Sequence, residues 1–93
     1  MNSTLFNYFE KPRAIKTILT LYFNDSVALD DLLHKIGGSK STGMKRIKEL
    51  VELNLASKEV SIEEPKKIFY KLNGKGVKIA KKMLAIGDDL VEE

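Results

Sequence analysis

The chain has 93 residues, of which 43% are hydrophobic and 31% are charged, and it contains no cysteine. This length predicts one small domain over residues 1–93 with a limited core, and the lack of thiols excludes disulfide bonds and thiolate metal sites. No apolar run approaches membrane-spanning length, and no basic segment precedes an apolar run at the N-terminus. We therefore expect an intracellular, cytoplasmic protein with no membrane partner.

The charge is distributed unevenly along the chain, although the net charge is only +3. Residues 1–38 carry four basic and four acidic side chains, whereas residues 39–82 carry twelve basic and five acidic ones. Residues 83–93 carry four acids and no base. Positive charge concentrated on one functional surface favours a polyanionic partner. A solvated lysine surface with no such partner is the alternative interpretation.

The first part of the chain contains an apolar N-terminal segment followed by two segments with helical spacing. Residues 1–10 form the dense apolar segment. Apolar side chains then recur at helical intervals over residues 15–22 and again over residues 29–36. Pro12 is suited to the first turn of the earlier helix, and the Gly37-Gly38 pair ends the later one.

A third helix is predicted over about residues 39–53, and it is both cationic and amphipathic. Ser39 is a suitable N-cap for it. Its apolar side consists of Gly43, Ile47, Leu50 and Val51. The opposite side carries Ser41, Thr42 and Lys45, and the flanks carry Arg46 and Lys48. Because residues 39–48 contain no carboxylate, the polar side offers only hydroxyls and cations, which is the chemistry that a DNA groove requires.

The pattern changes to that of a β-hairpin after this helix. Residues 56–60 and 68–72 are short runs suited to strands, and residues 61–67 form a tip that contains proline. Asn73 is suited to cap a last helix that runs to about Ile86. An acidic tail follows from residue 87, where we expect fraying.

Three segments, taken in order, resemble the winged helix-turn-helix transcription regulators of the MarR and ArsR type, especially small archaeal ones. Residues 26–37 are similar to the first helix and turn glycine of the motif, residues 41–55 to the recognition helix and its exit, and residues 69–76 to the second wing strand and the last helix. The resemblance implies an α+β fold, mainly α, with a three-helix core, a two-stranded β wing and a C-terminal helix. It also implies binding of double-stranded DNA.

The chain departs from the family pattern at three places. Gly43 stands where an aliphatic residue is usual, which lowers helix stability by up to ~1 kcal/mol relative to alanine. Asn54 replaces the usual glycine, although asparagine tolerates the left-handed conformation. Glu63 and Glu64 at the wing tip would repel phosphate, so the wing contacts DNA through its lysines or not at all.

The predicted DNA-contacting residues lie on the third helix and the hairpin. They are Ser39, Lys40, Ser41, Thr42, Lys45, Arg46, Lys48, Lys58, Lys66 and Lys67. Ser41, Thr42 and Lys45 are candidates for base edges, and Lys40, Arg46 and Lys48 for phosphates. The alternatives are an ordinary solvent-exposed helix face and, for the strand lysines, protection of a sheet edge against pairing.

The last helix carries more apolar surface than one small core needs, because two apolar lines run along it. One line covers the core, and the second is predicted to join the N-terminal segment in a homodimer contact. The predicted contact residues are Leu5, Phe6, Phe9, Ile79, Met83 and Ile86. The alternative is that the N-terminal segment folds over the last helix within one chain.

The leading hypothesis from the sequence is a homodimeric, sequence-specific DNA-binding transcription regulator with the recognition helix, about residues 40–53, in the major groove. The alternative is a winged helix that binds an acidic protein partner without specific DNA binding. An enzyme is not expected, because the sequence has no nucleophile–base pair and no glycine-rich phosphate loop. No cofactor and no metal are expected either.

Overall fold

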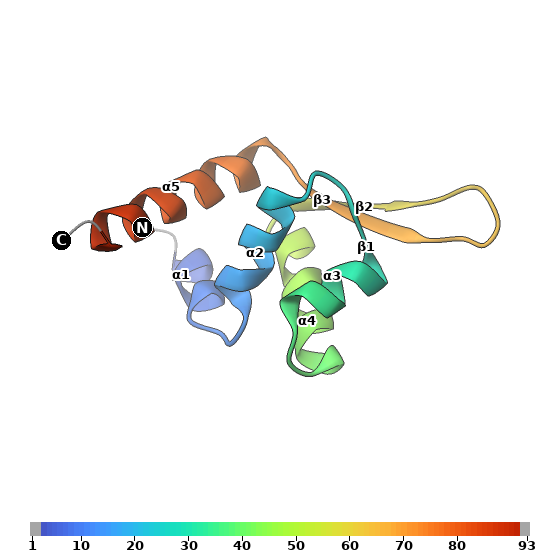
Figure 1. The fold of residues 1–93 in the computed structure, drawn as a ribbon, viewed down its shortest axis with the longest axis horizontal. Helices are drawn as coiled ribbons and strands as arrows, with labels where there is room; N and C mark the ends of the chain where they lie inside the picture. Colours follow the sequence, from blue (N-terminus) through green and yellow to red (C-terminus); the bar gives the residue numbers. More distant parts are fainter. Residues whose placement is uncertain (1–2, 92–93) are drawn as a thin grey trace.

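The computed structural model describes residues 3–91, and it describes the side chains of residues 4–86. Its elements in chain order are α1 (Ser3–Phe9), α2 (Ala14–Phe23), β1 (Val27–Ala28), α3 (Leu29–Ile36), α4 (Lys40–Glu52), β2 (Ala56–Val60), β3 (Ile68–Leu72) and α5 (Gly74–Val91). The molecule is elongated, 50 × 26 × 26 Å, with α5 reaching out at one end and the β2–β3 hairpin at the other (Figure 1). This confirms the α+β winged-helix architecture predicted from the sequence.

The hydrophobic core lies where α2, α3 and α4 pack together, covered by β3 and by part of α5. The largest fully buried apolar side chains are Ile18, Leu21, Leu32, Ile36, Ile47, Leu50 and Leu55. Apart from Leu55, which follows α4, these residues recur at helical intervals within each helix, so each helix presents one apolar stripe to the same core. That packing leaves the opposite side of α4 facing solvent.

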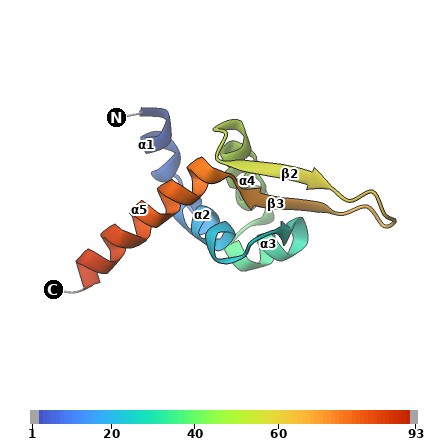
Figure 2. The same cartoon turned by 90° about the horizontal axis from the view of Figure 1, so that it is seen from above.

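A three-stranded antiparallel sheet with the order β1-β3-β2 forms the wing and its base (Figure 2). The predicted hairpin is confirmed, with Ala56 opposite Leu72 and Val60 opposite Ile68. The sequence did not predict β1, whose Val27 lies opposite Tyr70. A two-residue strand has no pattern of its own to recognise, and it forms here because β3 offers a free edge beside it.

The turns before and after α4 follow the predicted chemistry. The backbone N–H of Thr42 donates to Ser39 Oγ at 3.1 Å, so Ser39 is the N-cap of α4. Gly37 and Gly38 have φ values of 75° and 72°, in the left-handed region that glycine adopts without strain. Asn54 also lies in this region, with φ 61°, which confirms its predicted role at the exit of α4.

The start of α5 is fixed against the turn that follows α4. The Asn73 side chain accepts a hydrogen bond from the Gly76 N–H at 2.9 Å and donates one to the Asn54 carbonyl at 2.6 Å. A Cβ atom at Gly76 would overlap the Leu55 carbonyl oxygen, so the absence of a side chain permits this approach. The helix continues to Val91 instead of ending near Ile86 as predicted, because the intervening residues include no proline and one glycine alone does not end a helix.

Candidate nucleic-acid interface

Four residues, Ser41, Met44, Lys45 and Lys48, are exposed on the side of α4 that faces solvent, and the exposed Glu52 continues this side at the end of the helix. Their spacing of three or four residues places them on one face of the helix, opposite the buried Ile47 and Leu50. We call these four residues the outward stripe. The stripe contains two cations, a hydroxyl and a thioether, and the acid of this face, Glu52, lies four residues after Lys48.

Not every side chain of the first turn of α4 is free to contact a partner, although the sequence predicted all of the polar ones as DNA contacts. Lys40 and Ser39 are exposed, whereas Thr42 is half-buried. The Ser39 hydroxyl donates to the Thr42 hydroxyl oxygen at 2.8 Å, so both side chains already take part in the cap. Ser41 is therefore the first-turn hydroxyl that is exposed and outside the cap.

Met44 lies in the outward stripe, although it was not among the predicted DNA-contacting residues. Its side chain is exposed, and it lies three residues after Ser41 and four before Lys48. That spacing was the available signal, but an apolar residue next to the buried side was not assigned to the polar face. An exposed thioether beside two lysines offers apolar contact with a thymine methyl group.

Arg46 is not where the sequence prediction placed it. We expected it on a flank of the helix as a phosphate contact, but the residue is 8% exposed, and its Nη1 atom lies 3.1 Å from Glu49 Oε1. The other Glu49 oxygen accepts a hydrogen bond from Lys11 Nζ at 2.5 Å. Arg46 therefore holds α4 internally, and its burial argues against the predicted phosphate contact.

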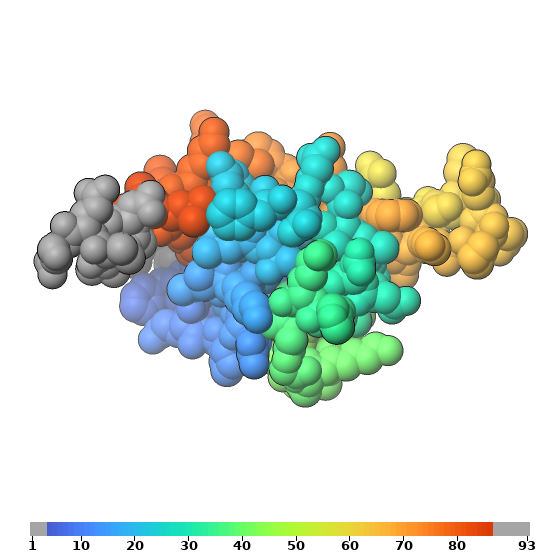
Figure 3. Space-filling view, viewed as in Figure 1, coloured from blue at the N-terminus to red at the C-terminus, as the bar shows by residue number. Residues whose placement is uncertain are grey.

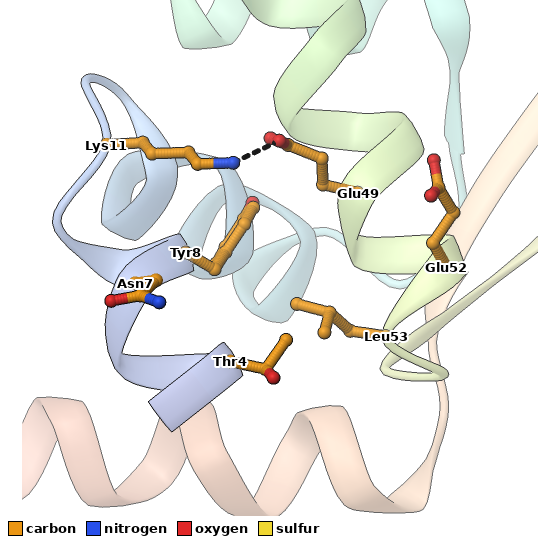
Figure 4. A pocket seen from close by; sticks show the side chains of 7 residues that line it. All are labelled: Thr4, Asn7, Tyr8, Lys11, Glu49, Glu52 and Leu53. Carbon is orange, nitrogen blue, oxygen red and sulfur yellow. Dashed lines mark hydrogen bonds and ion pairs between the residues drawn. The ribbon is translucent and has the colours of Figure 1, made fainter. Parts of the chain in front are cut away.

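The Lys11–Glu49 ion pair lies beside Tyr8, where α1 meets α4 (Figure 4). The buried Tyr8 hydroxyl donates to the Arg46 carbonyl oxygen at 3.0 Å. Burial raises the pKa of Tyr8 far above its usual range, and the Glu49 carboxylate raises it further while Arg46 opposes both, so the hydroxyl keeps its proton. The adjacent hollow of about 390 Å³ is lined by Thr4, Asn7, Tyr8, Lys11, Glu49, Glu52 and Leu53.

The structure brings Lys58 of the wing close to α4. A hollow of about 300 Å³ between α4 and the sheet is lined by Met44, Lys48, Val51, Glu52, Lys58 and Tyr70. Lys48 and Lys58 thus flank one groove from two different elements. Because β2 is an edge strand, Lys58 also fits the alternative role of blocking edge pairing.

The wing tip is separated from this groove. Lys66 and Lys67 are exposed, as are Glu63 and Glu64. The two lysines line a hollow of about 420 Å³ together with Ala28, Leu29, Asp30, Asp31 and Ile68. Their charge is therefore offset locally by acids from the first turn of α3, which the sequence did not indicate.

No family model and no curated protein sequence matches this chain. Among solved structures, the chain is similar to the protein AF1382 from Archaeoglobus fulgidus, at 26% identity and a TM-score of 0.68 over 86% of this chain and 89% of that one. It is similar to a putative MarR-family transcriptional regulator from Porphyromonas gingivalis W83, at 23% identity and a TM-score of 0.74 over 92% and 80%. It is also similar to MepR of S. aureus in its complex with DNA, at 16% identity and a TM-score of 0.74 over 96% and 73%.

The chain has the winged helix-turn-helix fold of the MarR-type transcription regulators. Within this winged helix, α3 and α4 are the helix-turn-helix, α4 occupies the position of the recognition helix, and the β2–β3 hairpin is the wing. Over the described residues, no helix is long and apolar enough to cross a membrane, and no group of acidic or histidine side chains could hold a metal ion.

The residues predicted for a dimer contact differ in exposure within this winged helix. Leu5, Phe9, Ile79 and Met83 are half-buried against the core of their own chain. Phe6 and Ile86 are 48% and 61% exposed. The N-terminal segment thus packs partly against its own chain, where α1 contacts α2 and Tyr8 bonds to α4. The dimer contact stays a prediction that now depends chiefly on Phe6 and Ile86.

Proposed function

We propose that this protein is a homodimeric, sequence-specific DNA-binding transcription regulator that places α4 in the major groove. The observation that carries the proposal is the outward stripe, which presents hydroxyl, thioether and ammonium groups on one helix face over residues 41–48, before the carboxylate of Glu52 at the end of the helix. A helix is about the width of the major groove, and such groups match its base edges and phosphates. The fold shared with MarR-type regulators, one of them in a complex with DNA, supports this proposal.

The outward stripe suggests a division of roles among its residues. Ser41 and Lys45 face base edges, with Met44 beside them for thymine methyl groups. Lys40 and Lys48 neutralise phosphates, together with Lys58, which lies on the wing side of the hollow between α4 and the sheet. Thr42, which is engaged in the cap, contributes to the DNA contact less than Ser41. Lys66 and Lys67 contact the backbone only where their attraction exceeds the repulsion from Glu63 and Glu64.

The dimer of the proposal uses α5 and α1. A two-fold axis near the exposed Ile86 would place the two wings at the outer ends of the assembly, because the wing lies at the opposite end of the molecule from α5 (Figure 1). Two recognition helices would then enter successive major grooves about 34–36 Å apart on a near-palindromic site.

Selection of bound duplexes from a random pool tests this function. We expect a near-palindromic sequence whose half-sites are separated by about 10–10.5 base pairs or a multiple of this spacing. A pool that gains no sequence preference, although the protein binds duplex DNA, would contradict a sequence-specific regulator.

Lys45→Ala and Lys48→Ala are expected to have different effects on the selected site. If Lys45 contacts a base, its removal should cost the selected site about 1–3 kcal/mol and relax preference at one position. Lys48→Ala should weaken selected and random DNA alike and lower the salt dependence. Competition binding with both duplexes distinguishes the two effects. Equal losses on both duplexes for Lys45→Ala would show that Lys45 is a phosphate contact.

The wing tip favours a second candidate function, a protein-interaction module. Ile62 is 96% exposed there beside Glu63 and Glu64, a combination that suits another protein better than a phosphate backbone. Undetectable binding to duplex DNA at low salt would favour this second function.

A further inference from the structure

Arg13 reaches from the start of α2 to the turn between α3 and α4. It is the residue before α2, has φ 68°, and its carbonyl accepts hydrogen bonds from the Thr17 hydroxyl at 2.6 Å and the Thr17 N–H at 2.9 Å. Its Nη1 atom donates to the Ile36 carbonyl at 3.3 Å. Its Nε and Nη2 atoms would lie 3.0 and 3.3 Å from a Cβ atom built at Gly38. The guanidinium therefore lies over the glycine turn that leads into α4.

A second cation lies against the same turn. Lys16 Nζ would be 3.7 Å from a Cβ atom at Gly37, and Lys40 begins α4 immediately beyond the turn. Arg13, Lys16 and Lys40 are all exposed. We call these three residues the turn patch. Lys11, their neighbour in sequence, is excluded because it pairs with Glu49.

The fold separates charges that balance in the sequence. Residues 1–38 contain equal numbers of bases and acids, but Asp30 and Asp31 lie beside Lys66 and Lys67 near the wing. Residues 11–24 and 32–48 contain no acid, and Glu10 is the acid nearest to the turn patch in sequence. Because exposed charges act over about 8–10 Å at ordinary salt, the local excess of cations decides the potential at the turn.

The turn patch lies on the same side of the molecule as the N-terminal end of α4. In Figures 1 and 3 the turn between α1 and α2 and the N-terminal end of α4 form neighbouring parts of the lower edge. The wing projects beyond the other side of α4 in both views. A major groove that receives α4 would therefore have the wing beside one phosphate backbone and the turn patch beside the other.

We propose that Arg13 and Lys16 form a second, sequence-independent contact with the DNA backbone, on the side of the recognition helix opposite the wing. The partner is the phosphate backbone of duplex DNA, so the inference rests on the proposed function. The glycine turn lets both cations approach the start of α4, and the Arg13–Ile36 hydrogen bond holds the guanidinium in place before DNA arrives.

The test measures duplex affinity against salt concentration for Arg13→Gln, Lys16→Gln and the double variant. Each lost phosphate contact should lower the slope of log affinity against log salt by about 0.9 and the affinity at about 50 mM salt by roughly tenfold. The losses should be the same on selected and random duplexes. Lys78→Gln, at an exposed lysine of α5, is the charge-matched control and should keep the wild-type slope.

The remaining outcomes each overturn the proposal and identify the reason. Wild-type slopes for Lys16→Gln and Arg13→Gln would show that the turn patch does not touch DNA, while the proposed function stands. An equal loss of affinity and of salt slope for Lys78→Gln would show that the total charge of the protein, and not a contact at the turn patch, determines the effect. A loss confined to Arg13→Gln, with a lower melting temperature and no rescue by Arg13→Lys, would make Arg13 a structural residue. A wild-type protein that binds no duplex would overturn the proposed function as well.

Discussion

Replacing Glu49 with alanine is expected to lower the free energy of unfolding by about 2–4 kcal/mol, because it leaves Arg46 without a carboxylate partner in a buried position. The Arg46 side chain is 9% exposed and that of Glu49 is 26% exposed, so the estimate lies toward the lower end of the cost of breaking a buried pair. The same substitution removes the acceptor of Lys11 and loosens the contact of α1 with α4.

Glu52→Ala is the matched control for this prediction. Glu52 lies one turn further along α4 and lines the same hollow as Glu49, but it is exposed and makes no ion pair among the residues that the structure describes. Chemical denaturation of both variants measures the difference in unfolding free energy. Arg46→Met added to Glu49→Ala should recover most of the loss, since no buried charge then remains. Equal stability of the two single variants would show that the ion pair does not stabilise the fold.

Replacing Ile86 with glutamate is expected to convert a dimer to a monomer and to lower affinity for a palindromic site by about 10²–10⁴, the gain that bivalent binding supplies. Each substitution appears twice in a two-fold contact, so two carboxylates would face each other where two apolar side chains met. Ile86 is a better position than Met83, which packs against its own core and whose loss would also destabilise the monomer.

Light scattering at micromolar concentration measures the change in mass for the Ile86 variant. Ile62→Glu, at a 96% exposed position on the wing tip, is the control and should leave the mass unchanged. A monomeric wild-type protein, or an Ile86→Glu protein that stays dimeric, would contradict the proposed interface. Weak binding to single half-sites should survive the substitution, because the recognition helix is untouched.

Local pattern was sufficient to predict most of the fold. The bounds of α3, α4, β2 and β3 follow from apolar spacing and from capping residues whose chemistry is local. Ser39 and Asn73 accept hydrogen bonds from backbone N–H groups three residues ahead, and Asn54 adopts a left-handed conformation. Such contacts span only a few residues, so the sequence contains nearly all the information that determines them.

The features that the sequence did not predict depend on contacts between distant residues. Arg46 is buried where α1 meets α4, because its side chain pairs with Glu49 and its carbonyl accepts a hydrogen bond from the Tyr8 hydroxyl. Tyr8 and Arg46 are 38 residues apart in the chain, so no local pattern indicates this contact. The seven-residue α1 is too short for a pattern that would identify it as a helix, and it depends on packing. The turn patch could not be predicted from the sequence, because residues 1–38 carry equal numbers of acids and bases and only the fold separates them.

The most direct test of the central claim is the affinity of the wild-type protein for duplex DNA as a function of salt. If the basic side that contains the outward stripe binds phosphates, a dimer making ~6–10 contacts should lose about 10³–10⁵ in affinity between about 50 and 200 mM salt. Fluorescence anisotropy with a labelled duplex measures this slope. Undetectable binding at 50 mM salt, or an affinity that does not change with salt, would contradict the assignment of this surface to DNA.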